Sequence, residues 1–231
     1  MILAAPAVRD LTHARVEVDE TWSICGAKQR QVDRGAKAEG SMWALTAIDS
    51  DSKLLISYLV GMCDGGYAME FAYDMADRVE SGLQRTGAGL AAYLDAGSDA
   101  FGDSVDYAQL IKVFGATRPD EARYSPAQCQ GIKKHVVTGN PDESLISTSY
   151  VERQNLTVRM HNRRFTRLTN AFSKSILNHV HSVALHVFYY NFIRKHQTIK
   201  TTPAVMAGVA DHPWTMLEFV EMLEREGAGR G

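Results

Sequence analysis

The chain has 231 residues, of which 45% are apolar and 23% are charged, and its net charge is −2. This balance excludes a disordered chain, and the three cysteines form no CxxC pair, which argues against structural zinc and for a reducing compartment. No run of about 20 apolar residues is present and the first residues make no convincing secretory signal, so we expect a cytoplasmic protein without a membrane partner.

The small net charge hides a segregation of charge along the chain. Nine of the 25 Lys and Arg, but only one of the 27 Asp and Glu, lie between Tyr150 and Lys200, which gives this segment +8 and the remainder −10. Basic segments bind polyanions because each phosphate contact releases condensed counterions. The pattern therefore indicates nucleic acid, with a solvated, positively charged helix face as the alternative.

The first half of the chain carries the signals of a mixed sheet. Apolar alternation from Arg15 to Ile24, and apolar segments at Met42–Ile48 and Leu54–Met62, predict three antiparallel strands. A helix, a strand, a second helix and a fifth strand are then expected at Tyr67–Val79, Leu83–Thr86, Leu90–Phe101 and Val105–Phe114. This order predicts an α/β fold with a mixed five-stranded sheet, three antiparallel strands first, and helices on both faces.

The second half is predicted to be mostly helical. Residues 115–149 are interrupted by Pro and Gly and are expected to form a long irregular connection. The stretch from Tyr150 to His196 contains neither Gly nor Pro, which predicts a long helical region with a break near Asn178 or Asn191. Two further helices are expected, one starting at 201–203 and one at 214–226.

Acidic residues stand at two unusual places. Asp19 and Glu20 lie inside the first predicted strand, where a charge is costly to bury unless it is paired or binds a metal; an edge-strand acid facing water is the alternative. Glu152 begins a helical stripe of mostly basic residues, with an apolar face opposite. The stripe consists of Glu152, Leu156, Arg159, Arg163, Arg167, Asn170 and Lys174. Two carboxylates brought together bind Mg²⁺, so the pattern favours metal-assisted phosphoryl transfer on DNA or RNA.

Two motifs carry a resemblance to a known family. The segment Val18-Asp-Glu-Thr-Trp-Ser23 resembles the DExW opening of the catalytic domain of insertion-sequence (IS1-type) DDE transposases. Ser147–Asn155 (STSYVERQN) is similar to the segment that carries the last acid of that family, and the residues that follow resemble the continuation of its helix. The similarity runs from about residue 15 to 223.

The resemblance implies an RNase H-like fold and a DDE mechanism. Two Mg²⁺ ions, or Mn²⁺, would be held by acids on the first strand, after the fourth strand and on a later helix, and would promote DNA strand cleavage and strand transfer. By matching motifs, Asp19 is the first acid and Glu152 the last, and both would be metal ligands. Basic residues near Glu152 would bind DNA: Arg153, Arg159, Arg163, Arg167 and Lys174.

The second acid is where the sequence departs from the family. Alignment of Tyr93-Leu94 with the family's Tyr-Leu pair places Ala88 at the position of the expected Asp. Alanine cannot bind a metal, and Asp106 is a poor substitute. Because members of a catalytic set act as a unit, we expect little or no catalysis from this chain. A decayed copy and a deliberate substitution are equally compatible with the sequence.

These inferences define an overall expectation. Residues 1–14 would be a tail, 15–200 the catalytic domain, and 201–231 a helical extension, without the N-terminal DNA-recognition region of such transposases. The partners would be element ends and target DNA, with no small-molecule substrate, in a homo-oligomer located in the bacterial cytoplasm at the nucleoid. The alternatives are a non-catalytic DNA-binding remnant or transposition inhibitor, and an RNase H-like nuclease acting on RNA or a hybrid.

Overall fold

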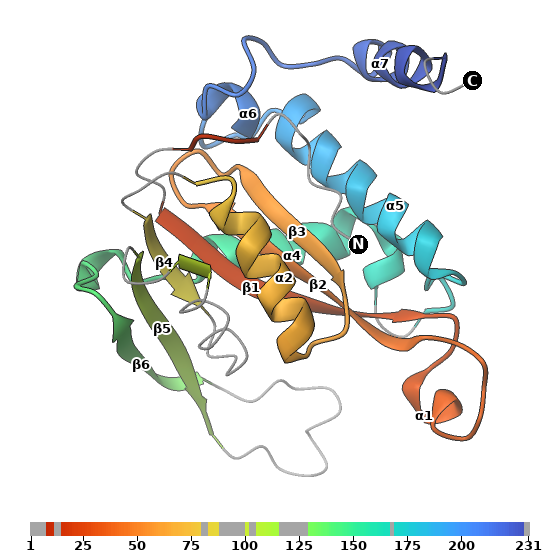
Figure 1. Ribbon diagram of the computed structural model, residues 1–231, viewed down its shortest axis with the longest axis horizontal. Coiled ribbons are helices and arrows are strands. Elements are labelled where there is room, and N and C mark those ends of the chain that lie inside the picture. The colour runs from red at the N-terminus through yellow and green to blue at the C-terminus, as the bar shows by residue number, and fades with distance from the viewer. Residues whose placement is uncertain are drawn as a thin grey trace.

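The computed structural model describes residues 8–11, 15–79, 83–87, 100–101, 105–115, 129–166 and 169–228. They form an α/β fold around a six-stranded mixed sheet with the order β3-β2-β1-β4-β5-β6 (Figure 1). The strands are β1 (Arg15–Cys25), β2 (Gly40–Asp49), β3 (Leu55–Gly61), β4 (Leu83–Gly87), β5 (Val105–Phe114) and β6 (Cys129–Thr138). The first three strands are antiparallel, as predicted, whereas β4 runs parallel to both β1 and β5.

The sheet has one strand more than the five predicted. β6 pairs antiparallel with β5 and lies within the segment that was expected to be irregular. β6 is an edge strand of the sheet, and eight of its ten residues are exposed. A strand with no buried face needs no apolar alternation, so its sequence, CQGIKKHVVT, gives no periodic signal.

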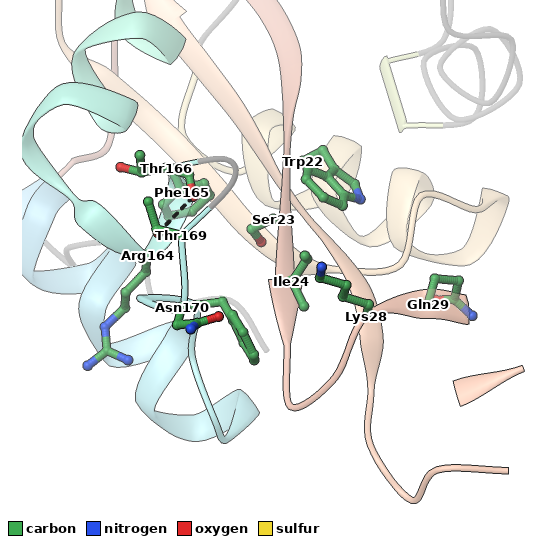
Figure 2. Close-up of a pocket in the computed structure, with 11 residues that line it drawn as sticks. Trp22, Ser23, Ile24, Lys28, Gln29, Arg164, Phe165, Thr166, Thr169 and Asn170 are labelled. Atoms are coloured by element: carbon green, nitrogen blue, oxygen red, sulfur yellow. Dashed lines mark hydrogen bonds between the residues drawn. The ribbon is translucent and has the colours of Figure 1, made fainter. Parts of the chain in front are cut away.

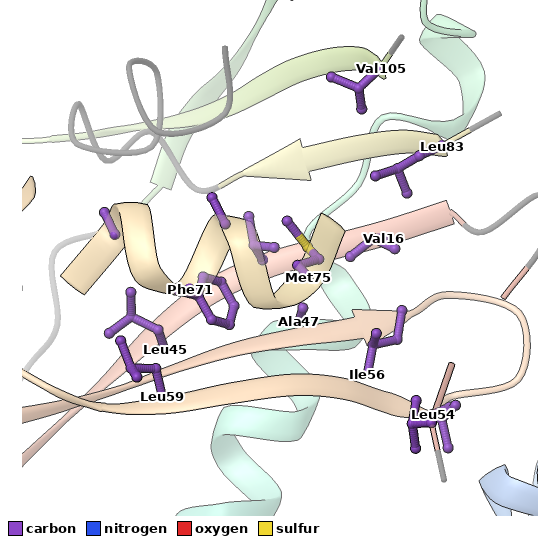
Figure 3. Close-up of a cluster of buried hydrophobic side chains, with 14 of the residues drawn as sticks. Val16, Leu45, Ala47, Leu54, Ile56, Leu59, Phe71, Met75, Leu83 and Val105 are labelled. Carbon is purple, nitrogen blue, oxygen red and sulfur yellow. The ribbon is translucent and has the colours of Figure 1, made fainter. Parts of the chain in front are cut away.

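One face of the sheet is covered by α2 (Gly65–Ala76), which confirms the helix predicted there. The Asp64 side chain caps this helix by accepting a hydrogen bond of 3.1 Å from the Tyr67 backbone N–H. Phe71 and Met75 point from α2 into a cluster of apolar side chains on the central strands, including Leu45 and Leu59 (Figure 3). Burial of this apolar surface is the main stabilising contribution on this side of the sheet.

The other face is covered by α4 (Ser149–His161) and α5 (Ile176–Phe188), so helices lie on both faces as expected. Val151 and Val158 of α4 and Val180 of α5 pack against apolar residues of β1, β2 and β3. This layer fixes α4 across β1, and the candidate site depends on that placement.

The break in the helical region does not fall at Asn178, which lies inside α5. α4 ends at His161, a 3₁₀ turn (Arg163–Phe165) follows, and α5 begins only at Ile176. Asn162 has an extended backbone, and its side chain accepts a hydrogen bond from the Arg164 N–H, which ends the helix without any Gly or Pro. The second predicted position, Asn191, lies in a π-helix (Tyr189–Ile193) that extends α5.

The remaining helices are short or peripheral. A one-turn helix, α1 (Gln29–Val32), lies in the polar loop between β1 and β2 (Figure 1). α6 (Pro203–Met206) begins where a helix was expected, and α7 (Met216–Ala228) begins two residues later than predicted. Apart from residues 100 and 101, the helix expected at 90–101 lies outside the described residues. No helix in the described ranges is long and apolar enough to cross a membrane.

Candidate active site

The candidate site is built on one polar face of β1. Glu17, Asp19, Thr21 and Ser23 alternate along the strand and share a face, because side chains of a strand point to opposite sides in turn. Glu17 is 2% exposed, and its Oε2 accepts hydrogen bonds from the Tyr150 and Val151 N–H groups at 2.7 and 2.9 Å. This carboxylate therefore caps the N-terminus of α4 from the sheet, where the helix dipole favours a negative charge.

The capping by Glu17 positions the next residues of both elements. Two residues further along β1, the Asp19 carboxylate Oδ2 accepts a 2.7 Å hydrogen bond from Asn155 Nδ2 of α4. Glu152 lies one helical turn before Asn155, on the same face of the helix. Its charge acts directly on the carboxyl group of Asp19. The structure thus brings together Asp19 and Glu152, which are far apart in sequence.

A lysine completes this group. Lys112 of β5 forms an ion pair with Glu152, and its positive charge also acts on Asp19. The register places Gln109 beside Gly87, and Gly87 beside Val18, so Lys112 and Asp19 both lie toward the carboxyl ends of the parallel strands. Crevices outside the carboxyl ends of the strands are where open α/β sheets bind ligands.

Burial makes the two strand acids weak. Burial, supported by the neighbouring charge of Glu152, raises the pKa of Asp19 to about 6 despite the Asn155 hydrogen bond and Lys112. Burial and then the charge of Asp19 raise the pKa of Glu20 to about 7. Each carboxylate is therefore held in the fold at a cost when it is ionised, which is typical of groups kept for a function.

This cost predicts a pH dependence of stability. A carboxyl whose pKa is raised on folding binds more protons in the folded state between its unfolded and folded pKa values. The contribution of Asp19 to stability therefore falls as pH rises from about 4 to about 6. We expect Asp19→Asn to be more stable than the parent at pH 8, by the order of 1–3 kcal/mol, and equal to it at pH 4. Urea unfolding at both pH values measures this difference.

The control for this prediction is Asp77→Asn, which removes an exposed carboxylate after α2. It should leave the unfolding free energy within about 0.5 kcal/mol of the parent at both pH values. A destabilising effect of Asp19→Asn at pH 8 would show that the ionised carboxylate is a net structural contact and that its burial has no cost.

The carboxylates fit the ligand chemistry of a single Mg²⁺ ion. Mg²⁺ is commonly held by one or two carboxylates, with water and substrate phosphate oxygens as its other ligands. Asp19 and Glu152 supply two, and the Lys112 ammonium shows that a positive charge is already stabilised beside them. Among the residues that the structure describes, no group of three or more His, Cys, Asp or Glu could hold a metal, so the third ligand of a two-ion site is not found there.

Ala88, the expected position of the second acid, lies outside the described residues. The last described residue before it is Gly87, which pairs with Val18 and so ends β4 next to Asp19. Asp106 cannot serve in its place, because the register sets it level with Arg15. That is four residues before Asp19, or about 13 Å along the strand, and Asp106 is engaged by the Asn140 N–H at 2.7 Å.

The predicted DNA-binding stripe is not one helical face. Arg153 and Arg159 lie on α4, but the helix ends at His161, so Arg163 falls in the 3₁₀ turn and Lys174 beyond it, over the ring of Phe172. Arg167 lies outside the described residues. The prediction assumed an unbroken helix, and the cap at Asn162 redirects the chain before the stripe can continue.

Two residues of the site were missed from the sequence. Glu17 was identifiable, since polar residues at every second position of an otherwise apolar strand indicate a buried polar face. Lys112 lies within the strand predicted at Val105–Phe114 and carries no motif of its own. Its role depends on the register between β4 and β5, for which the sequence holds no signal.

A hollow of about 680 Å³ lies beside this site and not in it. Figure 2 shows Trp22 and Lys28 on one side and Phe165 and Asn170, from the segment after α4, on the other. Beneath it, Ser23 Oγ and Ser173 Oγ hydrogen-bond to the two ring nitrogens of the buried His179, at 2.9 and 2.8 Å. Burial lowers the pKa of His179 to about 4, so this triplet is a neutral structural link between β1 and α5.

Comparison of the sequence with protein-family models and with curated proteins finds no match. The functional assignment therefore depends on the residues and on their arrangement.

Proposed function

We propose that this chain is the catalytic domain of a DDE-type DNA transposase, a polynucleotidyl transferase whose activity is impaired by Ala88. The observation that carries the proposal is the convergence of Asp19 on the central strand with Glu152 on the helix that crosses it. A strand acid and a helix acid in this relation are what an RNase H-like phosphoryl transferase requires.

The topology supports the same proposal. Strands β1 to β5 have the order 3-2-1-4-5, with an antiparallel first half and β4 and β5 parallel to β1. This is the arrangement that the resemblance to insertion-sequence transposases implies, with β6 added at the edge. The DNA partner and a homo-oligomeric state belong to the proposal on the same ground.

Each residue of the site has a distinct role in this proposal. Asp19 and Glu152 would hold Mg²⁺, and the ion would supply Lewis-acid activation of a water or a 3′-hydroxyl at the phosphodiester. Asn155 orients the Asp19 carboxylate by donating a hydrogen bond to Oδ2. Glu17 holds the first turn of α4, and therefore Glu152, against the sheet. Asp19 is half-buried, and this partial desolvation would strengthen its interaction with a cation.

One observation favours a second candidate, a DNA-binding protein without catalysis. The Lys112–Glu152 ion pair already neutralises one carboxylate, and no third acid is grouped with the pair within the described ranges. A transposition inhibitor or a domesticated remnant would keep the basic surface and show no response to divalent ions.

Binding of Mg²⁺ separates the two candidates. At pH 8, Mg²⁺ at tenfold excess over its Kd should stabilise the parent by about 1.4 kcal/mol, because a ligand of the folded state stabilises by RT ln(1 + [L]/Kd). For a chain of this size the corresponding rise in Tm is about 3–6 °C. Asp19→Asn and Glu152→Gln should abolish the rise, and Lys112→Met should enlarge it. Differential scanning fluorimetry over a Mg²⁺ titration measures all four proteins.

The matched control is Glu70→Gln, which removes an exposed carboxylate from α2 on the opposite face of the sheet. It should respond to Mg²⁺ as the parent does. An equal rise in Tm for the parent, Asp19→Asn and Glu152→Gln would mean that these acids are not the metal ligands, and the proposed catalytic site would be abandoned.

A further inference from the structure

A basic site lies on α4 beside the acidic pair of Asp19 and Glu152. Four cationic side chains line a hollow of about 470 Å³: Lys53 from the turn between β2 and β3, Arg153 from α4, and Arg194 and Lys195 from the segment after the π-helix. Its other polar lining residues include Tyr150, Thr157, His196 and Gln197, and none of the described lining residues is acidic. We call this hollow the basic groove.

The positive charges of the basic groove are not neutralised by nearby acids. Neither Arg153 nor Lys195 forms an ion pair in the described part of the chain. Lys53 stands over the ring of Tyr150, at 3.1 Å from its centroid, and Arg194 contacts the His161 ring. The charge of Lys53 helps to lower the pKa of Asp51, but the Asp51 carboxylate is already in an ion pair with Arg15.

Three segments that are distant in sequence converge to make the groove. Like charges gathered in one place repel each other, so such a cluster is costly unless an anion binds there. Arginine and lysine differ in how they hold phosphate, Arg through two parallel N–H donors and Lys as a point charge, and the groove offers two of each. Gln197, which also lines the groove, carries a side-chain amide that can donate to phosphate oxygens.

The groove and the acidic pair lie on different faces of the same helical turn. Arg153 directly follows Glu152, and successive helix residues point about 100° apart. Glu152 faces Asp19 and Lys112, whereas Arg153 faces Lys53 and Arg194. A polymer of phosphates that crosses α4 would therefore contact both sites, but a single small anion would not.

We propose that the basic groove binds the phosphodiester backbone of a nucleic-acid strand, beside the phosphate that reaches Asp19 and Glu152. The first part of this inference stands on the groove alone, and the second part rests on the proposed function. The contact is with the phosphate backbone, so it does not distinguish one base sequence from another. It would determine where the strand crosses α4, and any sequence specificity would come from other surfaces.

The test is the salt dependence of DNA binding in the presence of EDTA, measured by fluorescence anisotropy with a labelled duplex of random sequence. The double variant Arg153→Gln/Lys195→Gln should bind about tenfold or more weakly than the parent. Its slope of log K against log salt should be smaller by about 1.8, since each lost phosphate contact removes about 0.9. Arg153→Lys/Lys195→Arg keeps both charges and should retain most of the affinity.

The control double variant Lys133→Gln/Arg225→Gln removes the same charge from two exposed positions on β6 and α7. It should bind within about twofold of the parent. Equal losses in both doubles, or no loss in the groove double, would overturn the proposal. So would binding of poly-glutamate of matched charge that is as tight as binding of DNA and equally sensitive to the groove substitutions, since the groove would then fit an acidic protein.

The same measurements keep the two proposals apart. Loss of DNA binding in the groove double, together with no Mg²⁺ response of the parent, would leave the groove standing and remove the catalytic function. A Mg²⁺ response that depends on Asp19, with DNA binding unaffected by the groove double, would give the reverse result.

Discussion

Replacement of Ala88 by aspartate should raise the rate of Mg²⁺-dependent DNA nicking by about three orders of magnitude. Residues of a catalytic set act as a unit, so restoring one missing member recovers most of what its loss removed. Residue 88 follows Gly87 in the sequence, and Gly87, the last residue of β4, pairs with Val18 of β1. Conversion of supercoiled plasmid to the nicked form, with Mg²⁺ and with Mn²⁺, provides the measurement without knowledge of the element's ends.

Two variants show whether the gain comes from a metal ligand. Ala88→Asn adds a side chain of the same size without its charge and should remain as inactive as the parent. Combining Ala88→Asp with Asp19→Asn should cancel the gain. If Ala88→Asp binds DNA and responds to Mg²⁺ but nicks no faster than the parent, Ala88 is not the position of the missing acid.

Replacement of Asn191 by alanine should destabilise the fold by about 3 kcal/mol. Asn191 is fully buried in the π-helix, and its amide makes two hydrogen bonds of 2.9 Å, accepting from the Leu55 N–H and donating to the Leu55 carbonyl. Leu55 lies on β3, which is the edge of the sheet, so Asn191 pairs with the edge as a neighbouring strand would. Alanine leaves both buried backbone groups without a partner, at about 1–3 kcal/mol each. Urea unfolding measures the loss.

Asn178→Ala is the matched control, because Asn178 lies on α5 and is exposed. Its unfolding free energy should stay within about 0.5 kcal/mol of the parent value. Hydrogen exchange adds a local readout, since the Leu55 amide should exchange faster in Asn191→Ala than global unfolding alone explains. A loss below about 1 kcal/mol would mean that water replaces the amide at this edge.

The two acids of the candidate site could be identified from the sequence, but their proximity could not. Asp19 and Glu152 stand out locally, one as a charge inside an apolar strand and the other at the start of a basic segment. Their proximity is a property of the folded chain. It requires α4 to cross β1 at one position, and Glu17 and the apolar layer of Val151 and Val158 fix that position.

The predicted stripe of basic residues on one helical face was wrong, because the helix does not continue along it. A stripe computed at a constant helical angle is valid only while the helix continues, and α4 ends at His161. The side chain of Asn162 ends it through a hydrogen bond to the Arg164 N–H, a competition between side chain and backbone that no periodicity records. The basic groove shares Arg153 with the residues predicted to bind DNA, and it includes Lys53, which lies far outside the basic segment.

Patterns among neighbouring residues were sufficient to predict the first three strands and α2. The alternation of apolar residues determined β1, β2 and β3, helical spacing determined α2, and the run of charge after Tyr150 located the basic half of the chain. These are properties of neighbouring residues, so the amino-acid order alone specifies them. Only the tertiary structure decided the sixth strand, the partner of Lys112 and the convergence of Lys53 with Arg153 and Lys195. Each of these depends on strand register and helix placement, which are fixed by burial of surfaces that are distant in sequence and leave no local signal.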